Sequence, residues 1–100
     1  MHQFITGEQI RAARALVRLE QAELARHTGL SLETIKRLER IRGPVEAHTT
    51  TLIALHRTFE MLGVRLIWRE DGAVGVGLAP PATVGPGTQP PPARPMTTSQ

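Results

Sequence analysis

Two short segments with an apolar helical pattern stand only three residues apart in this sequence, and Gly29 lies in the gap between them. They cover residues 21–28 and about 32–40. Four apolar residues are expected to face inward from these segments and to fix their crossing: Leu24, Ala25, Ile35 and Leu38. So short a turn needs a residue that accepts left-handed backbone angles, and glycine accepts them at low cost. Because the small Ala25 side chain also lets two helices cross closely, the pattern predicts a helix-turn-helix unit.

Two further helices are predicted, one on each side of this unit. Thr6 and Gln9 form a capping-box pattern, which marks the start of a helix from 7 to about 18. A later segment, about 50–62, carries apolar residues at three- and four-residue spacing: Leu52, Leu55, Phe59 and Leu62. Gly63 closes this last helix. The sequence therefore predicts four helices in its first 63 residues.

After Gly63 the apolar period changes from that of a helix to that of a strand. Residues 64–69 are rich in strand-forming side chains, an Asp-Gly pair at 71–72 favours a tight turn, and 73–78 would form the return strand. A two-residue turn would place Trp68 opposite Gly75, whereas a longer loop would shift that register. A short β-hairpin is therefore predicted after the helices.

The prolines divide the chain, because seven of the eight lie after position 79. The segment 79–100 contains all seven of these and a single charged residue, Arg94. Such a composition does not bury enough apolar surface to offset the entropy of ordering, so a disordered Pro-rich tail is predicted. An alternative is that this segment is a ligand for an aromatic groove. The domains expected are thus a helical unit at 1–63, the hairpin at 64–78 and the tail.

Several kinds of chemistry are excluded by composition. The chain has no cysteine, which removes disulfides, thiol nucleophiles and cysteine-based zinc sites. Its histidines, at 2, 27, 48 and 56, include no pair at the helical ligand spacing, and no phosphate-binding glycine loop is present. We therefore expect no metal, no cofactor, no small-molecule ligand and no enzymatic activity. No apolar run approaches the ~20 residues that span a bilayer, and no signal peptide is recognisable, so a cytoplasmic protein is predicted.

The motifs around the central unit carry a family resemblance. They are Ile10-Arg11-Ala12-Ala13-Arg14, Gln21-Ala22-Glu23-Leu24-Ala25, Gly29, Ser31 and Ile35-Lys36-Arg37-Leu38-Glu39. Together they resemble the Xre family of phage-repressor and Cro-like helix-turn-helix transcriptional regulators. The resemblance implies a mainly α fold, a lambda-repressor-like bundle of about four helices followed here by the hairpin. It also implies binding to double-stranded DNA, usually as a homodimer on a pseudo-palindromic operator.

The same resemblance, with the helix positions, names candidate DNA-contacting residues. The second helix of the unit would enter the major groove, where Arg37 could bind guanine, Glu33 a cytosine amino group and Leu32 a thymine methyl. The full set comprises Gln21, Ser31, Leu32, Glu33, Thr34, Lys36, Arg37, Arg40, Arg42 and Thr49. Of these, Gln21, Lys36, Arg40, Arg42 and Thr49 are expected to contact phosphates. The alternative for Glu33 and Arg37 is an i,i+4 pair on a solvated helix face.

Arg14 and Glu39 are assigned a different role by the resemblance. In the family, matching positions form a largely buried ion pair, so both residues are expected to be structural. The chain also departs from the family pattern. Glu20 replaces the usual Ser or Asn cap, and Leu32 and Glu33 replace polar amides at the front of the recognition helix. The operator preference of relatives therefore does not carry over to this chain.

The charges agree with a nucleic-acid partner. The net charge is +3, and Lys36 is the only lysine among 12 cationic residues; the others are arginines, whose planar forks suit phosphates and guanine edges. The function predicted is sequence-specific DNA binding by a small regulator of the repressor type. The alternative is an antitoxin-like interaction module, in which the hairpin or tail binds another protein and DNA binding is secondary. RNA binding is a less well supported alternative, because no aromatic residue lies near the basic face.

Overall fold

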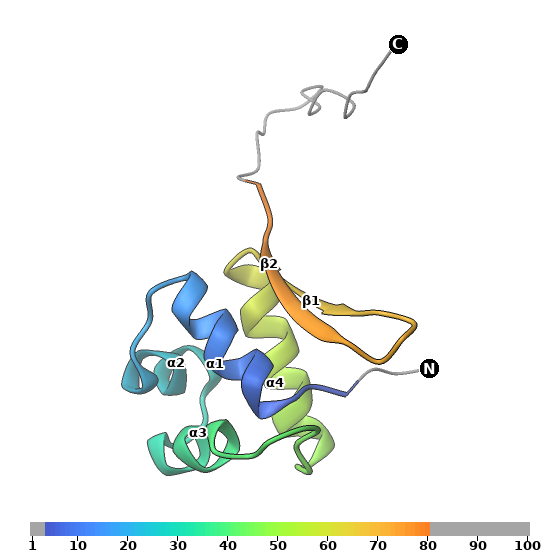
Figure 1. Cartoon of the computed structure of the whole chain (residues 1–100). Coiled ribbons are helices and arrows are strands. Elements are labelled where there is room, and N and C mark those ends of the chain that lie inside the picture. The colour runs from blue at the N-terminus through green and yellow to red at the C-terminus, as the bar shows by residue number, and fades with distance from the viewer. Residues whose placement is uncertain (1–3, 81–100) are drawn as a thin grey trace.

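The structure, a computed structural model, describes residues 4–80 of the chain (Figure 1). Its elements follow one another as α1 Gly7–Leu16, α2 Gln21–Thr28, α3 Leu32–Glu39, α4 Thr49–Met61, β1 Val64–Trp68 and β2 Val74–Leu78. The predicted fold class is confirmed: a mainly α bundle of four helices is followed by an antiparallel hairpin. The tail predicted from the prolines lies, from residue 81 onward, outside the described residues.

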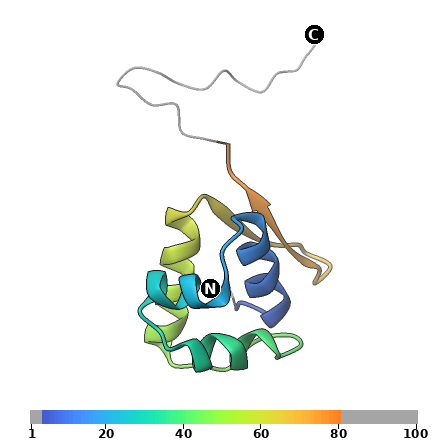
Figure 2. The same ribbon diagram turned by 90° about the vertical axis from the view of Figure 1, so that its left-hand side faces the viewer.

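The core lies among the four helices, which surround it in Figure 2. Eight apolar residues have no exposed surface: Ile5, Ile10, Ala13, Leu24, Ile35, Leu38, Leu55 and Phe59. Each helix contributes to this set, and Val64 at the start of β1 joins it with 4% exposure. The inward residues predicted for the helix-turn-helix unit are therefore buried, and their burial holds α3 against α1 and α2.

The first helix ends two residues earlier than its apolar pattern predicts. Arg18 adopts a left-handed conformation with φ 59°. Its N–H donates to the Ala15 carbonyl at 3.1 Å, and the Leu19 N–H donates to the Arg14 carbonyl at 3.1 Å. This is the Schellman arrangement, in which glycine usually occupies the left-handed position. No glycine marks this helix end, so the apolar pattern predicted a helix that was two residues too long.

Replacing Arg18 with glycine is expected to stabilise the protein by about 0.5–1 kcal/mol. Left-handed angles cost a residue with a Cβ about 1–2 kcal/mol, and the greater freedom of glycine in the unfolded chain offsets part of the gain. Urea unfolding of Arg18→Gly and Arg18→Ala checks this. Alanine removes the same charge but keeps the strained backbone. An equal shift in both variants would show that charge, not conformation, is responsible.

Gln9 joins α1 to the hairpin as well as capping the helix. As predicted, its N–H donates to Thr6 Oγ1 at 3.0 Å, and its Oε1 accepts the Thr6 N–H at 3.0 Å. Its Nε2 also donates to the carbonyls of Ile67 and Gly75, at 3.2 and 3.1 Å. Gln9 itself is only 2% exposed, so its side-chain amide is largely shielded from water. One side chain thus sets both the start of α1 and the position of the two strands above it.

The hairpin register predicted from a two-residue turn is wrong by one residue. Trp68 lies opposite Val74, and Ile67 lies opposite Gly75. The loop is longer than predicted: the Arg69 N–H donates to the Ala73 carbonyl at 2.8 Å, which leaves three residues in the loop. Gly72, at φ 93°, supplies the left-handed residue that such a three-residue loop needs. The shift determines which side chains face the helices.

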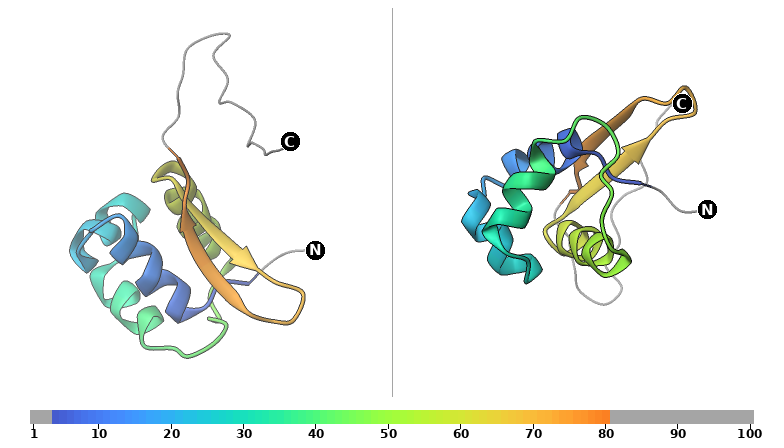
Figure 3. Two further views of the ribbon diagram at one scale, coloured as in Figure 1. Left: turned by 45° about the horizontal axis from the view of Figure 1, so that its top comes forward. Right: turned by 90° about the horizontal axis from the view of Figure 1, so that it is seen from below.

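One face of the hairpin covers the helices and the other faces outward (Figure 3). Leu66 and Val76 pack against the core, and Arg65 and Ile67 are exposed. Trp68 fixes the far end of β1, because its indole Nε1 donates to the Phe4 carbonyl at 2.8 Å. The indole also stacks on His56 of α4, with ring centroids 6.1 Å apart. The hairpin is therefore held at both α1 and α4.

Candidate nucleic-acid interface

The turn between α2 and α3 is built from local hydrogen bonds. Gly29 ends α2 at φ 78°, and its N–H donates to the Ala25 carbonyl at 2.9 Å. Thr28 Oγ1 donates to the Leu24 carbonyl at 2.9 Å and accepts the Leu30 N–H at 3.2 Å. These bonds pair the N–H groups of Gly29 and Leu30, so the turn that joins the two helices is fixed by hydrogen bonds. The unit predicted from Gly29 is present.

The outward face of α3 carries charged side chains that have no partner in the described part of the chain. Glu33, Arg37 and Arg40 are exposed, and Lys36 is half-buried. Within residues 4–80, neither the Glu33 nor the Arg37 side chain makes a hydrogen bond or a salt bridge, so the structure does not contain the predicted alternative, an i,i+4 pair. Both side chains are therefore available to a ligand outside the protein.

The first turn of α3 is closed by its cap. Ser31 Oγ accepts the Thr34 N–H at 3.0 Å and donates to Thr34 Oγ1 at 2.9 Å. The backbone N–H groups of Leu32 and Glu33 stand in the first turn, where a helix leaves them unpaired. The Ser31 hydroxyl is thus engaged in capping, while the Thr34 hydroxyl still has a hydrogen to donate. Leu32 is half-buried and packs partly on the core, which leaves only part of its side chain to meet a ligand.

An ion-pair network fixes the C-terminal half of α3 to the other helices. Arg14 binds Glu39 through two parallel bonds, from Nε to Oε2 at 2.8 Å and from Nη2 to Oε1 at 2.9 Å. Glu39 is 3% exposed, and the Arg14 side chain is 23% exposed. The hydrogen bond to Glu39 raises the pKa of Arg14, so the guanidinium stays charged across the physiological range. Arg14 also donates to the Leu19 carbonyl at 3.0 Å, which ties it to the segment between α1 and α2.

Gln21 belongs to the same network. Its Nε2 donates to Glu39 Oε1 at 3.0 Å, so its amide points toward α3. The sequence predicts a phosphate contact for this side chain, and in the structure its amide is bonded to Glu39. The backbone N–H of Gln21 still lies in the first turn of α2, at the positive end of the helix. This N–H is a second group on Gln21 that could meet a phosphate, so the predicted contact stays a prediction.

The remaining predicted phosphate contacts lie at the same end of the molecule as α3. Arg40 caps α3, Arg42 lies in the loop that follows, and Thr49 begins α4; all three are exposed. Figure 1 shows α3, this loop and the start of α4 together along the lower edge of the bundle. The structure therefore brings these predicted residues to one surface, which also includes the exposed face of α3.

Two residues that support this surface were missed or left open by sequence reasoning. Arg11 Nη1 donates to the Glu39 carbonyl, which is one of the unpaired carbonyls at the end of α3. Glu8 accepts the Gly43 N–H at 2.9 Å, and this bond lowers the pKa of the Glu8 carboxyl. Both contacts join residues about thirty positions apart in the chain. A local sequence pattern does not predict such contacts, because they depend on how α1 packs against the end of α3 and the loop that follows it.

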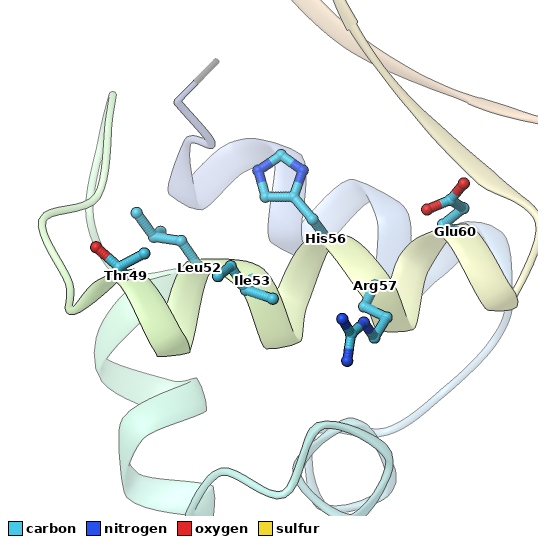
Figure 4. Close-up of a pocket in the computed structure, with 6 residues that line it drawn as sticks. All are labelled: Thr49, Leu52, Ile53, His56, Arg57 and Glu60. Atoms are coloured by element: carbon cyan, nitrogen blue, oxygen red, sulfur yellow. The ribbon is translucent and has the colours of Figure 1, made fainter. Parts of the chain in front are cut away.

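A shallow hollow lies on α4, and it does not resemble a ligand pocket. Figure 4 shows the residues that line it: Thr49, Leu52, Ile53, His56, Arg57 and Glu60. All six come from one helix, so the hollow has a floor but no opposing wall from another element. Small-molecule sites usually enclose most of their ligand. We therefore assign no ligand to this face of α4.

Comparisons with known proteins add nothing to this description: no protein-family model and no curated protein matches the chain. Within residues 4–80, no helix has the length and apolar character needed to cross a membrane. The same residues contain no group of three or more metal-ligating side chains. A functional assignment for the chain therefore depends on the geometry and charge of its own surface.

Proposed function

We propose that this protein is a sequence-specific double-stranded DNA-binding regulator of the Xre type, with α3 as its recognition helix. One observation carries the proposal. Glu33 and Arg37 lie one turn apart on the exposed face of α3, and neither side chain has a partner among the described residues. A rigidly held helix with free charged and polar side chains suits the major groove, which is about 12 Å wide and admits one helix.

The surrounding groups fit the phosphates on either side of such a groove. Arg40 and Arg42 supply exposed guanidinium groups, and the first turns of α2 and α4 supply unpaired N–H groups. Contacts of this kind position a protein on DNA without reading its sequence. In this proposal, Arg37 and Glu33 read bases, and Arg40, Arg42 and Thr49 set the register. The cell compartment proposed is the cytoplasm, and the action proposed is repression by a homodimer.

The decisive experiment is selection of bound duplexes from a random pool at physiological salt. We expect an enriched motif, and an inverted repeat would agree with a two-fold dimer. If no motif is enriched, sequence-specific binding is wrong, and the antitoxin-like interaction module becomes the better explanation. The salt dependence of the selected complex then counts the phosphate contacts, because each neutralised phosphate contributes about −0.9 to the slope of log K against log salt.

Arg37→Ala is expected to weaken binding to the selected site by about 5- to 150-fold, since a bidentate contact to guanine contributes about 1–3 kcal/mol. Discrimination at one base position should relax at the same time. Arg65→Ala is the matched control, because it removes an equal charge from the exposed face of the hairpin. Titration of each variant against matched and mutated duplexes measures both effects. Equal weakening by the two variants would mean that Arg37 contributes only general charge.

A further inference from the structure

One face of α4 keeps apolar surface exposed. Ile53 is 48% exposed, and its neighbour Leu52 is half-buried. Both line the hollow that runs along the helix from Thr49 to Glu60 (Figure 4). The hollow is too open to enclose a small molecule, but an extended piece of chain has room to lie along the helix there.

This hollow continues toward the hairpin. A second hollow adjoins it, because His56 and Glu60 line both. The other wall of the second hollow is β1, which contributes Leu66 and Trp68. Since the Trp68 indole stacks on His56, aromatic rings stand where the two hollows meet. Apolar surfaces with aromatic rings are the kind that proline-rich segments bind, because a polyproline II helix is already extended and loses little entropy on binding.

A proline-rich part of the same chain begins close to this surface. Residue 80 is the last that the structure describes. Just before it, the Ala79 N–H donates to the carbonyl of Gly63 at 2.6 Å, two residues after α4 ends (Figure 1). The sequence continues for 20 more residues and includes Pro90-Pro91-Pro92-Ala93-Arg94-Pro95. This run contains the Pro-x-x-Pro spacing of polyproline II ligands.

We propose that residues 90–95 pack along α4 as a polyproline II helix that runs in the same direction as α4. In this register Pro91 lies on Ile53, and Arg94 lies beside Glu60. The lengths agree, because three residues of polyproline II advance about 9 Å, and the seven steps from Ile53 to Glu60 advance about 10.5 Å along an α-helix. Since polyproline II repeats every three residues, Pro91 and Arg94 face the same side.

The linker is long enough for the segment to return along α4. Gly63, beside which the described chain ends, is ten residues beyond Ile53, a distance of about 15 Å at the rise of an α-helix. From Pro80 to Pro91 there are eleven steps, and a flexible chain of that length has a root-mean-square span of about 17–20 Å. A tethered segment reaches its highest local concentration when the span of its linker matches the distance to its site.

Charge agrees with the same register. Arg94 is the only charged residue in 81–100, and Glu60 is the only acidic residue that lines the hollow on α4. Within residues 4–80 Glu60 forms no salt bridge. In Figure 4 its side chain points away from Arg57, the cationic residue of the same hollow. Glu60 is therefore placed to pair with Arg94, which fixes the register even though exposed ion pairs stabilise little.

The tether makes the chain's own segment the occupant. A segment joined by a short flexible linker has an effective concentration in the millimolar range, whereas the same segment of a second copy is present only at the concentration of the protein. The proposed docking does not depend on DNA binding, so the two proposals stand or fall separately.

Spin labelling of the full chain tests the docking. The sequence has no cysteine, so Met96→Cys gives a single site for a nitroxide, one residue after the proposed segment. Nuclear magnetic resonance then measures how much intensity the nitroxide removes from each backbone N–H signal. We expect a strong loss at Arg57 and Glu60. Little or no loss there would overturn the proposal.

A glycine variant separates docking from the mere nearness of a tail. Pro91→Gly, Pro92→Gly and Pro95→Gly, made together in the same spin-labelled chain, leave the tail equally long but remove its preference for polyproline II. The loss at the α4 signals should then fall to what an undocked tail produces. An unchanged loss in this variant would also overturn the proposal.

A charge swap tests the register. Glu60→Arg and Arg94→Glu should each weaken docking about 1.5- to 5-fold, the weight of an exposed ion pair. The double variant should restore the loss of signal at α4, and failure to restore it would overturn the register. Glu70→Arg, an equal change at an exposed residue of the hairpin loop, is the matched control and should dock like the parent. Circular dichroism confirms that each variant folds.

A mixed sample shows which copy supplies the segment. Isotope-labelled chain without a nitroxide is mixed with spin-labelled chain that carries no isotope. We expect no loss at the α4 signals, because each segment docks on its own chain. A loss that grows with protein concentration would show that a second copy supplies the segment, which would overturn docking within one chain.

Discussion

Replacing Gly7 with alanine is expected to destabilise the protein by about 3 kcal/mol, at the upper end of the range for overpacking. A Cβ at this position would lie 2.0 Å from the Ile41 carbonyl oxygen and 2.7 Å from the Leu38 carbonyl oxygen. Both atoms belong to the backbone, so no side chain can rotate away to relieve the overlap. The start of α1 would have to move away from the end of α3.

Urea unfolding of Gly7→Ala measures this cost, and Gly75→Ala is the matched control. A Cβ at Gly75 would meet nothing within 4 Å, and this residue has no left-handed angle, so its substitution should change stability by less than about 0.5 kcal/mol. A cost for Gly7→Ala no larger than that of the control would show that α1 and α3 approach less closely than described. Because α3 is the proposed recognition helix, Gly7→Ala should also weaken DNA binding.

Removing the carboxylate of Glu39 is expected to lower the free energy of unfolding by about 3–5 kcal/mol, the range for removing one partner of a buried ion pair. Glu39→Ala leaves the Arg14 guanidinium without its two parallel bonds, and it leaves the Gln21 amide without an acceptor. Since the Arg14 side chain keeps 23% exposure, water can relieve part of the loss, which favours the lower end of that range. Glu33→Ala, an exposed change on the same helix, should be nearly neutral.

A double-mutant cycle separates the pair from its surroundings. Arg14→Ala with Glu39→Ala should lose clearly less than the sum of the two single variants, because the double variant leaves no buried charge alone. Free energies of unfolding from urea titrations supply the four corners of the cycle. Strictly additive losses would mean that Arg14 and Glu39 stabilise the fold independently, despite their geometry.

Local signals in the sequence predicted the parts of the fold that local interactions determine. The Thr6 and Ser31 caps and the left-handed Gly29 lie where their residue types indicate, and α2 has the predicted bounds. Each of these features depends on bonds within about four residues. The end of α1 was predicted wrongly, because Arg18 adopts a left-handed conformation that is unfavourable for a residue with a Cβ.

Features that depend on distant contacts were predicted less well. The hairpin register depended on one extra loop residue, and a shift of one residue moves side chains to the opposite face. The bonds from Gln9 to both strands, and the space that only Gly7 leaves, arise from packing across the fold. At the candidate site, sequence predicted the outward position of Arg37 but not the turn of the Gln21 amide toward Glu39. DNA contact by any of these residues stays a prediction.

Trp68 is the only tryptophan of the chain, and its surroundings make it an intrinsic spectroscopic reporter. Its indole joins three parts of the molecule, through the bond to Phe4, the stack on His56 and its place in β1. Undocking of the hairpin would expose the ring and shift its emission to the red, while far-ultraviolet dichroism follows the helices. Recording both signals during one titration would reveal whether the hairpin and the helix-turn-helix unit unfold together or in separate steps.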